Sequence, residues 1–136
     1  MKKTIILMVL SFAAFAISCN SKTDGTQMKT VMAVHDEVMP EMGKMGKLVG
    51  ELSSKEDSTA VGLKYKEARM DLQEAHKSMM TWMQNFGTRF TSDEILNGAE
   101  LSDEKQVWLN EEQVKIEDLR EQINGSIKTA EELLKK

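Results

Sequence analysis

Apolar residues recur along this chain at alternating spacings of three and four, and this spacing most constrains its fold. The first unbroken series contains Met28, Val31, His35, Val38, Met42, Met45, Val49 and Leu52. The second contains Val61, Tyr65, Ala68, Leu72, Ala75, Met79, Trp82 and Phe86. The third contains Leu109, Glu112, Ile116, Leu119, Ile123, Ile127, Ala130 and Leu134. Each series, called a seam below, lies on one face of an α-helix.

The three seams predict an all-α fold. Helices are expected over about residues 28–52, 58–87 and 102–135, joined as an up-down-up three-helix bundle with coiled-coil-like packing. No stretch alternates with period two, so no sheet is expected. Pro40 lacks a backbone N–H, and it is expected to kink the first helix or to divide it near Met39.

Short polar segments predict where the helices begin. Asp57 or Ser58 is the expected N-cap of the second helix, and Ser102 that of the third. One capped helical turn is expected over residues 92–98 in the connection between them. Phe90 is expected to fold back onto the apolar end of the second helix.

The N-terminal segment has the organisation of a bacterial export signal. Lys2 and Lys3 precede an apolar stretch, Thr4–Ile17, that is shorter than the roughly 20 residues needed to span a bilayer. The stretch leads into Ala16-Ile17-Ser18-Cys19, which resembles the lipobox of bacterial lipoproteins. Residues 1–18 are therefore predicted to be a cleaved lipoprotein signal peptide.

The lipobox resemblance implies that the thiol of Cys19 receives a diacylglycerol and that the new N-terminus is acylated. Such acyl chains hold a protein on a membrane without a spanning helix. Residues 19–27 then form a flexible tether. Asn20, rather than Asp, follows the cysteine, and by resemblance to sorted lipoproteins this indicates the outer membrane, facing the periplasm. The alternatives are an ordinary signal peptide or a cysteine buried in a core helix.

Composition excludes several classes of function. The chain has 136 residues, which fits one domain, and a single Cys, which excludes disulfides, zinc fingers and CxxC redox pairs. Its 22 acidic and 18 basic residues argue against a nucleic acid partner. It lacks GxGxxG, P-loop, HExxH and GxSxG motifs. We therefore expect no enzymatic activity and no catalytic residues.

Two histidines and one glutamate define a candidate site. If the first interhelical turn is centred near residue 56, His35 and His76 lie at the same level of the bundle. Glu112 is the carboxylate on the third seam, and loop lengths place it opposite His76. One layer is therefore predicted to contain His35, His76 and Glu112, with Met39, Met79 and Met80 nearby.

This layer has two interpretations. Two imidazoles and a carboxylate suit zinc, and imidazole with thioether suits copper, so the layer is a possible metal site. The other interpretation is a buried polar layer in which a His–Glu hydrogen bond fixes the helix register. The loop lengths leave the register uncertain by a full helical turn, so formation of the layer is itself open.

The remaining features of the sequence say less about function. Trp82, Phe86 and Phe90 are expected to close the end of the bundle with Trp108, or to form a ligand platform. Four apolar side chains are expected to face outward: Leu63, Met70, Val107 and Val114. Two of these, Val107 and Val114, could mark a partner surface. A loosely packed methionine-rich core could also bind a small apolar ligand.

Three segments resemble a group of small bacterial lipoproteins from flavobacterial and related genomes, often labelled "viral A-type inclusion protein". They are HDEVMPEMGKMGKL (35–48), AHKSMMTWMQNFG (75–87) and VWLNEEQ (107–113). The resemblance implies a coiled-coil-like composition but no activity, substrate or cofactor.

The sequence thus predicts a lipid-anchored helical bundle that acts as a structural or adaptor module of the cell envelope. Its expected partners are the membrane and an envelope protein or a second copy of the chain. The alternatives are copper or zinc binding by the histidine layer, and binding of a small apolar ligand.

Overall fold

The computed structural model describes residues 25–135. The predicted signal peptide, Cys19 and most of the predicted tether lie outside the described residues. The described part contains five helices and no strand: α1 (Thr26–Val38), α2 (Glu41–Ser53), α3 (Ala60–Arg89), α4 (Ser92–Leu96) and α5 (Asp103–Leu134). The predicted all-α class is confirmed. None of the described helices combines the length and apolarity needed to cross a membrane.

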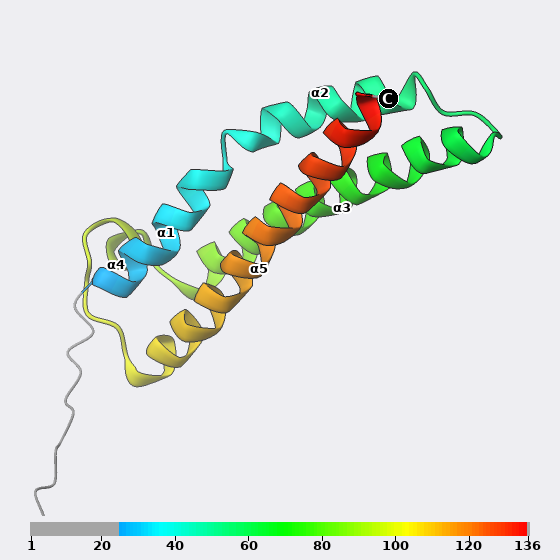
Figure 1. Cartoon of the computed structure of the whole chain (residues 1–136). Helices are drawn as coiled ribbons and strands as arrows, with labels where there is room; N and C mark the ends of the chain where they lie inside the picture. Colours follow the sequence, from blue (N-terminus) through cyan, green and yellow to red (C-terminus); the bar gives the residue numbers. More distant parts are fainter. Residues whose placement is uncertain (1–24, 136) are drawn as a thin grey trace, which may run out of the picture.

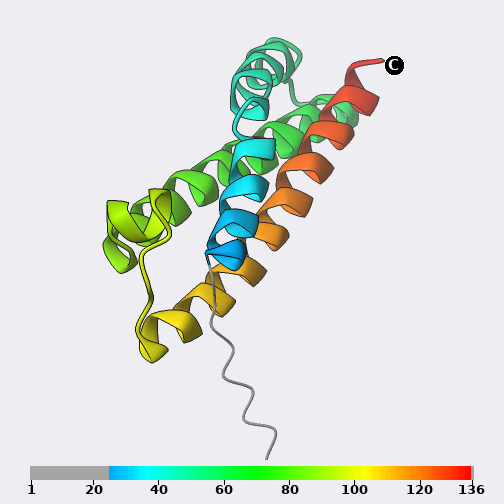
Figure 2. The same cartoon turned by 90° about the vertical axis from the view of Figure 1, so that its left-hand side faces the viewer.

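The long helices pack side by side along one axis (Figure 1). α1 and α2 follow one another along the molecule, and α3 returns beside α2 in the opposite direction. α5 then runs in the direction of α1 and α2 and contacts α1, α2 and α3. α2 packs on α3 and α5, whereas α1 packs mainly on α5 (Figure 2). The start of α1 and the C-terminal end of α5 consequently lie at opposite ends of the molecule.

The predicted seams form the core. All members of the third seam from Leu109 to Ala130 are buried, as are those of the second from Ala68 to Phe86. Val61 is an exception, because its side chain at the start of α3 is 56% exposed. In α1 and α2, Val34 and Leu48 are buried although they are not members of the first seam. The buried face there is wider than a 3-4 seam.

Pro40 divides the first predicted helix into α1 and α2. The last α1 bond runs from the Met39 N–H to the His35 carbonyl, and Pro40 has no N–H with which to continue the series. Of the two expected effects of Pro40, a kink or a division near Met39, the structure shows the division. α1 also begins two residues before the predicted start. Gln27, assigned to the tether, donates side-chain hydrogen bonds to Asn110 and Gln113 of α5.

The turn between α2 and α3 is organised by Asp57 and Thr59. Thr59, rather than the predicted Asp57 or Ser58, is the N-cap of α3, and its hydroxyl accepts a hydrogen bond from the Gly62 N–H at 3.0 Å. The Asp57 carboxylate accepts from both the hydroxyl and the backbone N–H of Thr59, and these bonds lower the pKa of Asp57. An ion pair between Glu56 and Arg69 closes the turn onto α3.

α4 and the start of α5 are joined through Glu94. Thr91 and Glu94 form a capping box at α4, one residue before the predicted start. Lys105 of α5 donates to both carboxylate oxygens of Glu94 at 2.7 and 2.8 Å, and this bond is the main cause of the lowered pKa of Glu94. Ser102 caps α5 as predicted.

Candidate functional site

Glu112 is the buried ionisable residue at the centre of the candidate site. It lies on the α5 seam, as predicted, and is 1% exposed. Its Oε1 accepts hydrogen bonds from Arg89 Nη1 at 3.0 Å and from Lys115 Nζ at 2.8 Å. A carboxylate removed from water needs such partners, because desolvation of an unpaired charge costs several kcal/mol. The buried acidic position is confirmed, but its partners are Arg89 and Lys115 rather than a histidine.

Arg89 connects the end of α3 to α5. Besides Glu112, its Nη1 donates to Glu111 at 2.8 Å, and this bond lowers the pKa of Glu111. Its guanidinium lies 5.5 Å from the centroid of the Trp108 ring. Arg89 was not predicted from the sequence as a functional residue. The available signal was a cation just after the predicted end of the second helix, since the next long helix carries two adjacent acids, Glu111 and Glu112.

His35 lies beside the aromatic residues of α3. Its side chain is 14% exposed, its Nδ1 lies 2.9 Å from an Asp36 carboxylate oxygen, and its ring stacks on Trp82 with centroids 5.9 Å apart. Trp82 stacks on Phe86, and Phe86 contacts Phe90, each at 4.8 Å. Phe90 is buried, as predicted. His35 therefore extends the predicted aromatic cluster.

His76 lies elsewhere, on an exposed position of α3. It borders a crevice of about 180 Å³ between α2 and α3, together with Met45 and Val49. The predicted layer of His35, His76 and Glu112 does not form: His35 contacts Asp36 and Trp82, Glu112 binds Arg89 and Lys115, and His76 is exposed. Among residues 25–135, no three His, Cys, Asp or Glu side chains are grouped as a metal ion would need.

The three methionines that were predicted near this layer also differ in how far they are buried. Met79 is fully buried, Met39 is half-buried and Met80 is 49% exposed. Copper or zinc binding stays a prediction, and metal analysis of purified protein is its direct test. Binding of an apolar ligand also stays a prediction. The crevice beside Met45 is smaller than the roughly 300–1,000 Å³ of typical ligand sites.

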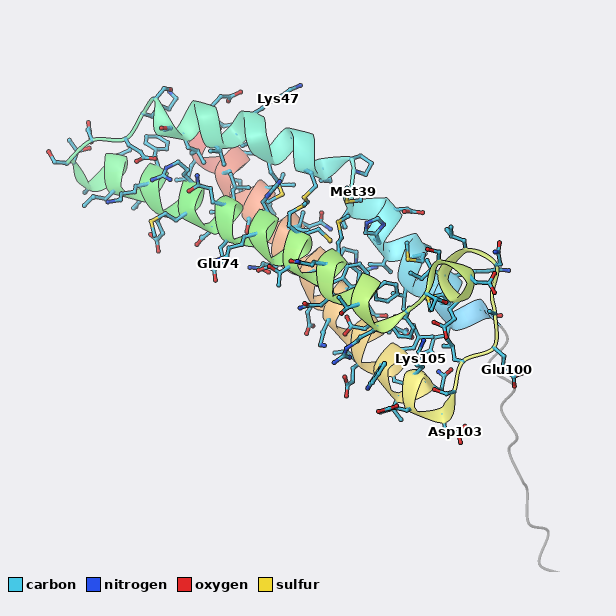
Figure 3. All side chains as sticks on the ribbon, turned by 180° about the vertical axis from the view of Figure 1, so that it is seen from behind. Met39, Lys47, Glu74, Glu100, Asp103 and Lys105 are labelled. Carbon is cyan, nitrogen blue, oxygen red and sulfur yellow. The ribbon has the colours of Figure 1, made fainter. Side chains whose placement is uncertain are left out.

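A larger groove of about 770 Å³ runs between α3 and α5, and all its lining residues belong to these two helices. Trp82, Glu112 and Leu119 are its buried members. The exposed members include two acids and two lysines: Glu74, Lys77, Lys115 and Asp118. Figure 3 shows Glu74 on the side of α3 turned away from α2.

Two polar atoms of the groove residues are buried without a hydrogen-bond partner among the described residues. One is the donor Trp82 Nε1 and the other is the acceptor Glu112 Oε2. Buried polar groups of folded proteins are nearly always hydrogen-bonded. Both atoms belong to residues that line the groove, yet neither atom is itself accessible from solvent.

Comparison of the chain with protein-family models, curated proteins and solved structures gives no match. The candidate site is thus defined by the geometry of α3 and α5 alone.

Proposed function

We propose that this protein is a lipid-anchored helical-bundle module of a bacterial cell envelope, with a structural or adaptor role and no enzymatic activity. The observation that carries the proposal is Cys19, which follows a short apolar segment with Lys2 and Lys3 before it. A lone cysteine at this place is better explained by acylation than by any pairing within the chain.

The folded part supports an anchoring role for the N-terminal segment. α1 begins at Thr26, seven positions after Cys19. Gln27 bonds to Asn110 and Gln113 of α5, so the first turn of α1 is tied to the longest helix. A lipid on Cys19 would therefore hold the whole bundle close to a membrane surface. In this proposal α1 and α2 together form the first arm of an up-down-up three-helix bundle.

The adaptor role is supported by outward-facing apolar side chains. Leu63 and Met70 are spaced by one heptad on α3, and Val107 and Val114 by one heptad on α5. Each is more than half exposed. Isolated exposed apolar residues are common, but the heptad spacing suits contact with a further helix. The partner would be another envelope protein or a second copy of this chain.

The membrane is proposed to be the outer membrane, with the bundle facing the periplasm, because Asn20 follows the cysteine where inner-membrane retention would favour an aspartate. The resemblance to small flavobacterial lipoproteins agrees with this location.

Lipidation is tested by substituting Cys19. In cells supplied with radiolabelled palmitate, the wild-type protein should incorporate label and fractionate with membranes. Cys19→Ala should lose the label and leave the membrane fraction, because the thiol is the proposed site of diacylglycerol attachment. Ser21→Ala is the matched control and should keep both properties. Labelled Cys19→Ala protein would refute acylation at this residue.

A further inference from the structure

His76 is an exposed imidazole on α3 without a hydrogen-bond or ion-pair partner among residues 25–135. On the side of α2 its side chain borders the crevice of about 180 Å³. Each nitrogen of a neutral imidazole either donates or accepts a hydrogen bond, and the unprotonated nitrogen can bind a metal ion. Within the described part of the chain, no other side chain competes for the nitrogens of His76.

The second donor of the candidate site is the thioether of Met80, one helical turn further along α3. Met80 is 49% exposed. Residues four apart on a helix project from the same face, with Cβ atoms roughly 5–6 Å apart. Side chains at this spacing can bind one metal ion together, as the two histidines of the HExxH motif do. α3 therefore places an imidazole and a thioether within reach of one ion.

The surroundings of His76 determine which metals this pair suits. The α3 residues one helical turn before and after His76 include no carboxylate: Leu72, Gln73, Met79 and Met80. The rest of the crevice lining is also uncharged: Met45, Gly46, Val49, Leu72 and Gln73. Magnesium, calcium and manganese prefer carboxylate and carbonyl oxygens, whereas thioethers select Cu(I). The donor set therefore favours a soft monovalent ion.

The α2 side of the site leaves space beside the imidazole. Gly46 borders the same crevice as His76, and a Cβ added at Gly46 would meet no atom within 4 Å. An ion bound to His76 would therefore not displace a side chain of α2 at this position.

His35 lacks the freedom that His76 has. It also has a methionine four residues later, Met39, which is half-buried at the junction of α1 and α2 (Figure 3). The His35 ring, however, stacks on Trp82 and its side chain is 14% exposed. Its Nδ1 lies 2.9 Å from a carboxylate oxygen of Asp36. Rotation of His35 towards a metal ion would break these contacts, so the α3 pair is the one that can rearrange around an ion.

We infer that His76 and Met80 form a binding site for a soft monovalent metal ion, Cu(I) or its analogue Ag(I), on the face of α3 next to α2. The site differs from the predicted histidine layer, because it uses neither His35 nor Glu112. The inference goes beyond the proposed anchoring role and does not depend on it, since both ligands lie in the folded bundle.

The test follows the methionine methyl signals of the ¹³C-methyl-labelled full chain by NMR during titration with Ag(I) in chloride-free buffer. Every sample carries Cys19→Ser and no histidine tag, because a free thiol or added histidines would also bind the ion. Met80→Leu identifies the Met80 signal. This signal should shift and saturate at one Ag(I) per chain. The signal of Met70, which is 54% exposed on α3 and has no histidine one helical turn away, should move much less.

Two substitutions at exposed positions locate the site. His76→Ala removes the imidazole and Met80→Leu removes the thioether, and each should weaken Ag(I) binding about tenfold in isothermal titration calorimetry. Met70→Leu is the matched control and should bind as tightly as the parent chain. Zn²⁺ should leave the Met80 signal in place, because zinc is bound by Cys, His and carboxylate side chains rather than by thioethers.

The inference is overturned if the Met80 signal does not saturate in a large excess of Ag(I), or if the Met70 signal responds with the same affinity. It is also overturned if His76→Ala leaves the Met80 shift unchanged, or if Cu(I), added anaerobically with a reductant, does not shift the Met80 signal. A Met39 signal that responds at lower Ag(I) concentration than that of Met80 would overturn it too, because the preferred site would then be at His35.

Discussion

The two histidines differ in what their side chains contact. His35 stacks on Trp82 and is largely buried, whereas His76 is exposed on α3. The sequence predicts that both face inward, because His35 is a member of the first seam and His76 follows the apolar Leu72 by one helical turn. His76 is displaced by about 100° from the adjacent seam residue Ala75, and this angle carries its side chain out of the interface.

Substitution of the histidines should separate these environments. His35→Ala removes a stacked ring and should lower the free energy of unfolding by about 1 kcal/mol. His76→Ala, the control at an exposed position, should change it by less than about 0.5 kcal/mol. Urea denaturation followed by circular dichroism measures both values. Equal losses for the two variants would contradict the placement of His76.

The position of Glu112 could be predicted from the sequence, whereas its partners could not. A carboxylate on an otherwise apolar seam indicates burial, because the neighbouring seam residues fix its face. The partner depends on how α3 and α5 align, and the estimate from loop length placed His76 opposite Glu112. The actual partner, Arg89, lies thirteen positions further along the chain. Because α4 folds within the connection between α3 and α5, the number of residues in that connection does not predict how the two helices align.

At the scale of elements, the seams predicted the faces of α3 and α5 almost completely. These helices are long and regular, and each packs on one side over most of its length. The first arm was predicted less well because Pro40 changes the direction of the chain. α1 and α2 therefore each bury a face of their own, and these faces include Val34 and Leu48.

The α2–α3 turn leaves no room for a side chain at Gly62. A Cβ there would lie 2.5 Å from the backbone nitrogen of Asp57. Gly62→Ala should therefore force the turn to move and lower the free energy of unfolding by about 1–3 kcal/mol. Thermal unfolding with a matched glycine variant measures the effect.

Gly125 in the middle of α5 is the matched position, because a Cβ there meets no atom within 4 Å. Gly125→Ala should raise the free energy of unfolding by about 0.5–1 kcal/mol, since alanine favours the helix. If both variants were stabilised, the close approach of Asp57 to Gly62 would be wrong.

At the scale of the whole molecule, Glu112 and its partners Arg89 and Lys115 join the end of α3 to α5 through a buried charge. Arg89→Ala leaves Glu112 with Lys115, whose side chain is half exposed. It should lower the free energy of unfolding by about 2 kcal/mol. Glu112→Met removes the charge and keeps the volume, and it should be neutral or stabilising by about 1 kcal/mol.

Chemical denaturation of both variants measures this difference. Glu111→Ala removes the exposed partner of Arg89 and is the control, with an expected loss below about 1 kcal/mol. A large loss for Glu112→Met would show that the carboxylate contributes net stability to the fold.

The start of α1 and the C-terminal end of α5 lie at opposite ends of the molecule (Figure 1). If Cys19 anchors the bundle, the position of a residue along the bundle therefore determines its height above the bilayer. α5 has 32 residues and is about 48 Å long. Glu112 lies nine residues after Asp103, about 14 Å from the membrane-proximal end. The α5 residues that line the groove extend from Glu112 to Leu119, so the groove would lie between about 14 and 24 Å along α5, in the half of the bundle nearer to the membrane.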